Sequence, residues 1–311
     1  SRVHWRAPGT DSWRQIADEP QLEPTFTPVA VDGRGTLYVT AAGDRAGVSM
    51  LHRFDFATGK PEPEPLLKTP GFDFDGELVM DATGREAFGV RTTVDAETTA
   101  WLHPRMRAIQ KTIDERLPAT TNTVTCGRCD DPDLVLVAAA SDRDPGTWYL
   151  VRPKTDQWTL VGRARRDIDP KRMATLDLHR MAARDGLEIP VWVTKPPGPT
   201  TAPRPAVVLV HGGPWVRHGT WRWDADAQFL ASRGYVVIEP EFRGSTGYGG
   251  RLFRAGWKQW GRAMQDDLAD AVAWAAARGW IDPRRVCIAG ASYGGYAALM
   301  GLARHPDAFR C

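Results

Sequence analysis

The chain has 311 residues, enough for about two domains of roughly 150 residues each. Apolar residues make up 42% and charged residues 25%, and 40 Lys and Arg are balanced by 38 Asp and Glu. This balance argues against a protein that binds nucleic acid or a membrane surface through its overall charge. The longest apolar stretches, 206–210 and 134–140, are far shorter than the roughly 20 residues of a membrane-spanning helix. We therefore expect neither a nucleic-acid partner nor a membrane span.

Residues 1–172 are predicted to form short β-strands joined by tight turns. Runs of β-forming residues alternate with Gly, Asp and Thr-Gly-Lys turns. Four strands in about 40 residues correspond to one propeller blade, which gives about three to four blades here. A closed propeller typically has about 4 to 8 blades, so we interpret the segment as part of a larger propeller, in a chain truncated at both ends. The expected strands are 27–33, 35–40, 50–56, 64–68, 76–81, 86–91, 134–140, 147–152 and 157–161, after a hairpin within 1–16.

A helix is predicted near residues 104–118, as an insertion between two groups of these strands. Apolar residues recur there at helical spacing, namely Met106, Ile109, Ile113 and Leu117. A single apolar stripe is what any surface helix shows, so we interpret it as a packing face instead of a groove for a partner.

Residues 173–311 change to strands that alternate with helices. This alternation predicts a mostly parallel sheet with helices on both faces, which is the beginning of an α/β-hydrolase domain. The expected elements are a hairpin that turns at Asp185–Gly186, strands 206–210, 235–238 and 286–289, and helices 225–232, 262–278 and 293–303.

The sequence Gly290-Ala-Ser-Tyr-Gly294 stands between a predicted strand and a predicted helix. This G-x-S-x-G pattern is typical of a nucleophile elbow, a sharp turn that holds a serine hydroxyl clear of the sheet. Glycine is expected at both of its positions because the strand and helix backbones approach closely there. We therefore predict that Ser292 is a catalytic nucleophile. The N-terminus of the following helix would stabilise the negative charge that develops on the substrate carbonyl.

A second pattern, His211-Gly-Gly-Pro214, follows the strand that comes third in the predicted sheet. In an α/β-hydrolase, a backbone N–H from this loop and the N–H of the residue after the nucleophile form the oxyanion hole. The candidate donors are therefore Gly212, Gly213 and Tyr293. His211 precedes the nucleophile in the chain, so we expect it to fix the loop instead of acting as a base.

Three stretches together resemble the prolyl oligopeptidase family of serine peptidases, closest to its acylaminoacyl-peptidase branch. They are Val210-His-Gly-Gly-Pro-Trp, Glu241-Phe-Arg-Gly-Ser-Thr-Gly-Tyr-Gly249 and the run from Gly279 to Tyr296. The resemblance implies a propeller ahead of an α/β-hydrolase domain and hydrolysis of short peptides at a buried site between them. It also implies Ser292 as the nucleophile of a triad completed by Asp and His, with no metal or organic cofactor.

The triad is where the sequence departs from this pattern. In α/β-hydrolases the acid and then the histidine follow the serine, and here only His305 and Asp307 do so. His305 lies roughly 18 Å from Ser292 along the predicted helix, at about 1.5 Å per residue, too far for a hydrogen bond. We therefore expect the triad Asp and His to be absent from this chain and the 311-residue piece to have negligible peptidase activity.

Three residues near the predicted oxyanion loop are candidates for substrate binding: Trp215, Arg217 and Arg243. An arginine there could hold a substrate carboxylate with two hydrogen bonds, or could be an ordinary ion-pair residue. Seven of the 13 tryptophans lie between Trp215 and Trp280. They could line a cleft for apolar side chains, but we favour packing in the core and between domains.

Two other functions stay open from the sequence. An esterase or acyl hydrolase shares the elbow and the oxyanion loop, although the propeller favours peptides as substrates. A non-catalytic binding module, in which the propeller recognises a partner, would explain the missing triad residues. A homo-oligomer is also compatible with this composition, and of the possible compartments the cytoplasm is favoured.

The remaining motifs predict structure and not chemistry. Cys126 and Cys129 have the spacing of half a zinc site or a redox pair, but no second half is present, so we interpret them as a structural or incidental pair. Cys287 is expected to be a small buried hydrophobe. Asp266 and Asp267 lie at a predicted helix start, where the helix dipole accounts for them without a metal.

Overall fold

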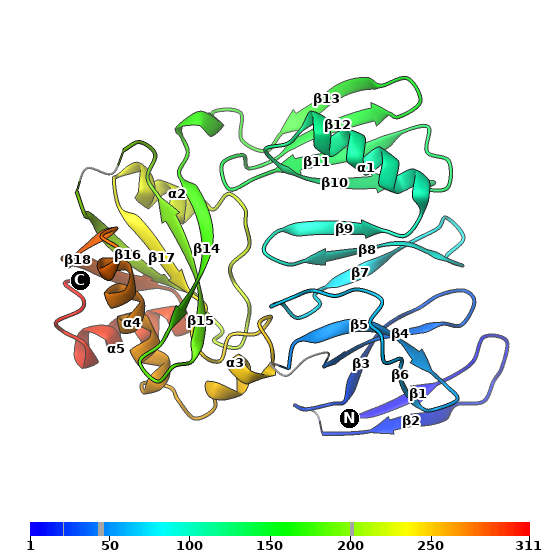
Figure 1. Ribbon diagram of the computed structural model, residues 1–311, viewed down its shortest axis with the longest axis horizontal. Helices are drawn as coiled ribbons and strands as arrows, with labels where there is room; N and C mark the ends of the chain where they lie inside the picture. Colours follow the sequence, from blue (N-terminus) through cyan, green and yellow to red (C-terminus); the bar gives the residue numbers. More distant parts are fainter. Residues whose placement is uncertain (21, 43–46, 200–201) are drawn as a thin grey trace. The chain divides into compact units, whose positions relative to one another are not determined.

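The structure is a computed structural model that describes residues 1–20, 22–42, 47–199 and 202–311. Its chain divides into two compact units, each described here by itself (Figure 1). Unit 1 comprises Ser1–Ala138 and Trp148–Val161, and unit 2 comprises Ala139–Thr147 and Gly162–Cys311. In the described ranges, no helix has the length and apolar character needed to cross a membrane.

Unit 1 consists mainly of small sheets in which strands adjacent in the chain are also neighbours in the sheet. The two-stranded sheet is β1 (Arg2–Trp5) and β2 (Arg14–Asp18). A four-stranded sheet follows, with β3 (Phe26–Val31), β4 (Leu37–Ala42), β5 (Ser49–Asp55) and β6 (Lys60–Pro61). Next is the three-stranded sheet of β7 (Gly76–Met80), β8 (Ala87–Thr93) and β9 (Glu97–Trp101). The last is β10 (Thr121–Cys126), β11 (Val135–Ala140), β12 (Thr147–Arg152) and β13 (Gln157–Arg163).

Most of the strands expected in this part of the chain are present, but one expected strand is absent and two strands were missed. The strand expected at 64–68 is wrong, because Leu67 forms only an isolated bridge with Leu51 and the fourth strand is β6. Strands β9 and β10 were not predicted. Both are rich in threonine and carry polar residues, so their sequences lack the apolar alternation that marks a half-buried strand.

The predicted helical insertion is helix α1 (Pro104–Arg116). Proline stands in its first turn, where the missing N–H costs no hydrogen bond. Met106 and Ile113 are fully buried and pack with Val135, Val137 and Val151 of the adjacent sheet. The apolar stripe is therefore a packing face, as predicted.

The pair Cys126 and Cys129 forms a disulfide at the edge of the same core. A disulfide fits a structural pair and a redox pair alike, so the structural interpretation of Cys126 and Cys129 stays a prediction. Within the described ranges, no group of three or more His, Cys, Asp or Glu side chains is arranged to hold a metal ion.

Unit 2 is built on one five-stranded sheet with the order β14-β15-β17-β16-β18. Pairs β14–β15 and β15–β17 are antiparallel, whereas β17–β16 and β16–β18 are parallel. The sheet is therefore mixed, and the prediction of a mostly parallel sheet is wrong in this respect, because the long β14–β15 hairpin joins its edge. The strands are β14 (Thr175–Ala182), β15 (Glu188–Lys195), β16 (Arg204–Val210), β17 (Val236–Pro240) and β18 (Ile281–Gly290).

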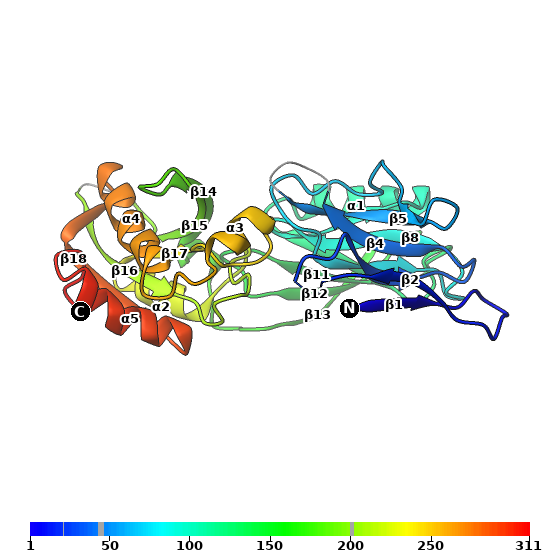
Figure 2. The same cartoon turned by 90° about the horizontal axis from the view of Figure 1, so that it is seen from below.

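The helices of unit 2 pack on this sheet, with α2 against β15 and β17 and with α4 and α5 beside β18 (Figure 2). A short helix, α3, was not predicted. Gly279 ends α4 in a left-handed conformation, as the sequence indicated. The helices are α2 (Ala225–Ser232), α3 (Gly250–Ala255), α4 (Ala263–Ala277) and α5 (Tyr293–Arg304), with a 3-10 turn at Pro170–Arg172.

The outer edge of β18 pairs with the residues that follow α5. Arg310 donates its N–H to the carbonyl of Val286, and Ile288 donates to the carbonyl of Cys311. Cys287 is half-buried and forms a disulfide with Cys311. The prediction that Cys287 is a small buried hydrophobe is therefore wrong. The apolar strand around it suggested burial, but Cys287 lies at the edge of the sheet and is bonded to Cys311.

Candidate active site

Ser292 occupies the turn between β18 and α5, with φ 55° and ψ −121°. For a residue other than glycine this left-handed conformation costs roughly 1–3 kcal/mol, and such strain is concentrated at functional sites. The side chain is exposed, and the residue is the N-cap of α5. A hydroxyl at this position therefore lies outside the sheet and next to the positive end of a helix dipole.

The glycines on either side of Ser292 are required by close backbone packing. Val210, the last residue of β16, lies beside Gly290 in the parallel pairing. A Cβ on Gly290 would stand 2.5 Å from the carbonyl oxygen of Val210, and a Cβ on Gly294 would stand 2.1 Å from it. Any side chain would clash at either position. This close packing is the reason expected for the two glycines of the G-x-S-x-G pattern.

The loop that follows β16 lies against Ser292. A Cβ on Gly212 would stand 3.5 Å from the Cβ of Ser292 and 3.4 Å from the carbonyl oxygen of Ala291. Gly213 has φ 112°, which favours glycine. The structure thus brings together Ser292, Tyr293 and the two loop glycines named from the sequence.

His211 is buried beneath this loop and stabilises it through hydrogen bonds of its imidazole ring. A carbonyl oxygen can only accept, so Nδ1 carries the proton and donates to the carbonyl of Gly212 at 2.7 Å. Nε2 then accepts from the hydroxyl of Ser245 at 3.0 Å. Burial lowers the pKa of His211 to about 4, so the ring is neutral at neutral pH. This arrangement supports the structural role expected for His211.

Two buried glutamates of β17 and the residue after it were not recognised in the sequence. Glu241 is 1% exposed and accepts hydrogen bonds from the backbone N–H groups of His218 and Gly219. The Glu239 side chain is 11% exposed. Burial raises the pKa of Glu241 to about 7 and that of Glu239 to about 8. The sequence feature that could have identified this pair is two glutamates at alternate positions of an otherwise apolar strand.

Arg243 takes the ion-pair role and not the substrate-binding role. All three of its guanidinium nitrogens donate to the carboxylates of Asp185 and Asp267. Its side chain is 8% exposed and that of Asp267 is fully buried. Its use as a partner for a substrate carboxylate is therefore corrected, because the buried guanidinium already binds two carboxylates and each of its three nitrogens donates to one of them.

The other two substrate-binding candidates lie in the loop after β16. The Nε of Arg217 donates to the carbonyl of Gly219 at 3.3 Å, and its guanidinium lies over the ring of Tyr248. Trp215 is 56% exposed. Their contact with a substrate stays a prediction.

For the seven tryptophans between Trp215 and Trp280 the sequence favoured packing in the core and between domains, and the structure supports burial only in part, since four of them are half-buried and three are exposed. The exposed three are Trp215, Trp257 and Trp260. Trp260 packs edge-to-face on Tyr293, with 5.0 Å between ring centroids. An exposed aromatic surface therefore lies beside the residue that follows the nucleophile.

His305 lies at the C-terminal end of α5, the helix that Ser292 begins. Its Nε2 is 3.1 Å from a carboxylate oxygen of Asp266, which also accepts from Arg304. The pair Asp266 and Asp267 thus forms ion pairs in addition to facing the start of α4.

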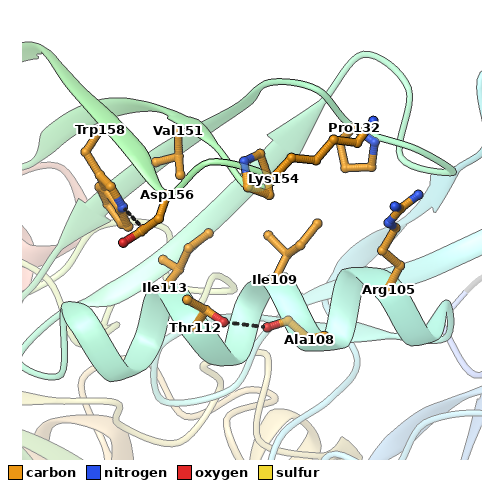
Figure 3. Close-up of a pocket in the computed structure, with 11 residues that line it drawn as sticks. Arg105, Ala108, Ile109, Thr112, Ile113, Pro132, Val151, Lys154, Asp156 and Trp158 are labelled. Carbon is orange, nitrogen blue, oxygen red and sulfur yellow. Dashed lines mark hydrogen bonds between the residues drawn. The ribbon is translucent and has the colours of Figure 1, made fainter.

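Unit 1 contains a separate pocket of about 330 Å³ between α1 and the sheet that includes β12 and β13 (Figure 3). Ile109, Ile113 and Val151 contribute to its apolar floor. The charged side chains on its rim are already ion-paired: Lys154 with Asp131 and Asp133, Arg105 with Asp131, and Asp156 with Arg116. The described side chains that line this pocket include no serine or cysteine, and its charged groups are balanced by these ion pairs.

Comparison with known proteins agrees with the chemistry of this site. The prolyl oligopeptidase family, Peptidase S9, matches residues 221–311, which include the elbow. Dipeptidyl aminopeptidase BIII of Pseudoxanthomonas mexicana is 33% identical over 312 residues, which cover 96% of this chain and 44% of that protein. The chain belongs to the prolyl oligopeptidase family. The family expected from the sequence motifs is therefore confirmed.

Two further proteins match almost the whole chain. Dipeptidyl peptidase family member 6 of Caenorhabditis elegans is 27% identical over 91% of this chain and 41% of its own length. A crystal structure of puromycin hydrolase superposes with a TM-score of 0.69 at 25% identity, over 96% of this chain and 45% of that one. The chain thus spans less than half the length of these relatives. Its assignment to the acylaminoacyl-peptidase branch stays a prediction.

Proposed function

We propose that this chain is part of a serine peptidase that hydrolyses short peptides through an acyl-enzyme on Ser292. The observation that carries the proposal is the strained turn that holds Ser292 against the loop of Gly212. In the proposed reaction the serine oxygen attacks the peptide carbonyl, and the backbone N–H of Tyr293 and one from the loop stabilise the oxyanion. Loss of one such donor typically costs about 10²–10³-fold in rate.

The proposed reaction needs a base that His305 does not supply. The base of an α/β-hydrolase follows the nucleophile in the chain, and the histidine that does so here lies at the opposite end of α5 and contacts Asp266. We infer that the triad histidine and its carboxylate come from residues outside these 311. The 311-residue chain alone is then expected to have negligible turnover, with Ser292 present but not activated.

We propose the same domain organisation that the sequence suggested, with residues 1–172 as part of a β-propeller and 173–311 as the first part of the hydrolase domain. Two four-stranded sheets with strands in chain order support the propeller interpretation. The names of the curated relatives favour release of dipeptides from the amino ends of short peptides.

The test uses the longest natural reading frame that contains these residues. Dipeptidyl coumarin amides, the same amides with a blocked amino group, and p-nitrophenyl acetate are assayed with the parent protein and with Ser292→Ala. We expect hydrolysis of the unblocked amides and its loss in Ser292→Ala. Hydrolysis of the acetate alone would favour an esterase, and activity that survives Ser292→Ala would overturn the proposal.

A further inference from the structure

The carboxyl group of Glu241 connects the loop beside Ser292 to the end of β17. It accepts from the backbone N–H groups of His218 and Gly219, at 3.1 and 2.5 Å, and from the hydroxyl of Tyr248 at 3.4 Å. Its own backbone N–H donates to the carbonyl of Pro190 on β15. A carboxyl group buried this completely is retained only with such partners, so these contacts hold the turn at 217–219 firmly.

Gly219 reaches this carboxyl group because it carries no side chain. A Cβ at Gly219 would stand 2.0 Å from Nε1 of Trp192. The backbone therefore lies directly against the indole of Trp192, itself buried in β15. Through this approach the turn at 217–219 is fixed on two sides, by Glu241 and by Trp192.

The same carboxyl group faces the ring that holds Gly212. Oε2 of Glu241 lies 3.4 Å from Nε2 of His211, and Nδ1 of His211 donates to the carbonyl of Gly212. A peptide unit is planar, and in a trans unit the carbonyl and the following N–H point in opposite directions. The ring therefore fixes the direction of the Gly213 N–H, one of the candidate oxyanion donors.

From these contacts we propose that Glu241 is a positioning residue for the oxyanion loop, acting through the hydrogen-bonded turn at 217–219 and through its packing against the ring of His211. The inference rests on the proposed peptidase function of Ser292. Glu241 does not touch the substrate in this proposal. It fixes the position of the backbone N–H donors of the loop, which matter most when negative charge develops on the carbonyl oxygen of the substrate. Its replacement should therefore destabilise the transition state more than it weakens substrate binding.

The test compares Glu241→Ala and Glu241→Gln in the active parent enzyme. Glu241→Ala removes every contact of the carboxyl group and is expected to lower kcat about 10–100-fold with little change in KM, as a misplaced catalytic group does. Affinity for a peptide aldehyde, which forms an oxyanion on the serine, should fall by a similar factor. Glu241→Gln keeps an oxygen for the two N–H donors and should stay within about threefold of the parent.

Glu239→Gln is the matched control, because Glu239 lies two residues earlier in the same chain segment and faces this turn only at the ring of His218, 4.0 Å away, with no hydrogen bond to the turn's backbone among the described residues. It should leave kcat and aldehyde affinity unchanged. The proposal is overturned if Glu241→Ala keeps the parent kcat, or if kcat falls only as far as the folded fraction falls in a thermal melt. Ser292→Ala separates the two hypotheses, since activity that survives it contradicts the peptidase proposal whatever Glu241 does.

Discussion

A methyl group on Gly294 would stand 2.1 Å from the carbonyl oxygen of Val210. Both atoms belong to backbone, so neither can turn away as a side chain would. Gly294→Ala is therefore expected to destabilise unit 2 by about 3 kcal/mol, the upper end of the usual cost of overpacking. Gly295→Ala is its control, because a Cβ there would meet its nearest atom at 3.4 Å. In urea titrations Gly295→Ala should be neutral or slightly stabilising, and equal stability of the two variants would contradict the packing argument.

Adjacent carboxylates in α4 should differ strongly in their contribution to stability. Asp267 is fully buried against Arg243, whereas Asp266 is partly exposed and pairs with Arg304. Asp267→Ala leaves a buried guanidinium without its main partner, which typically costs about 3–5 kcal/mol. Asp266→Ala removes contacts with Arg304, Arg184 and His305, of which the two guanidiniums are about half exposed, and should cost about 1 kcal/mol. Chemical denaturation of both variants measures the difference, and similar losses would show that Arg243 finds another partner.

Stability should fall as the pH rises from about 6.5 to 8. An unfolded glutamate has a pKa near 4.3, whereas burial raises those of Glu241 and Glu239 to about 7 and about 8. In this range the folded chain binds more protons than the unfolded chain, so unfolding releases protons and becomes easier at higher pH. The lowered pKa values of His211, His179 and His218 act in the opposite direction, but their unfolded imidazoles are mostly neutral above pH 7, so the fall in stability is steepest between pH 7 and 8.

Glu239→Gln tests this pH dependence. A glutamine stays neutral, so the variant should lose less stability between pH 6.5 and 8 than the parent, by at most about 1.4 kcal/mol per pH unit for one proton. Equilibrium unfolding of both proteins at several pH values gives the two slopes. Parallel slopes would mean that Glu239 titrates as it does in the unfolded chain.

Two replacements of Ser292 that both remove the hydroxyl should differ in stability, because only one of them keeps the strained backbone. Ser292 has φ 55°, which glycine adopts freely and alanine does not. Ser292→Gly and Ser292→Ala both lack the hydroxyl, yet Ser292→Gly should be more stable by about 1 kcal/mol, because relief of strain exceeds the entropy cost of glycine. Thermal melts of the two variants make the comparison, and a more stable alanine variant would show that the turn carries no strain.

The turn at Ser292 and the loop after β16 were predictable because their sequence signals are local. Gly290, Ser292 and Gly294 must stand in fixed order around one sharp turn, and His211-Gly-Gly-Pro214 follows one strand, so short windows of sequence contain the whole constraint. The helix α1 and most strands are equally local, since each shows its own apolar period.

The missed features depend on contacts between distant segments. Glu241 receives N–H groups from a turn more than 20 residues away, and nothing in its own strand announces them. Arg243 could be assigned to an ion pair only once Asp185 and Asp267 were seen beside it. The mixed direction of the sheet likewise follows from where the β14–β15 hairpin joins, which no local pattern encodes.

The contact between Trp260 and Tyr293 gives this protein a built-in spectroscopic reporter. The indole is 49% exposed, so a ligand can alter its surroundings, and its ring touches the residue whose backbone N–H is a candidate oxyanion donor. A fluorine atom incorporated into the indole of Trp260 would respond to ring-current changes from Tyr293. Its resonance could follow occupancy next to Ser292 in a variant without a nucleophile, where no turnover is available to measure.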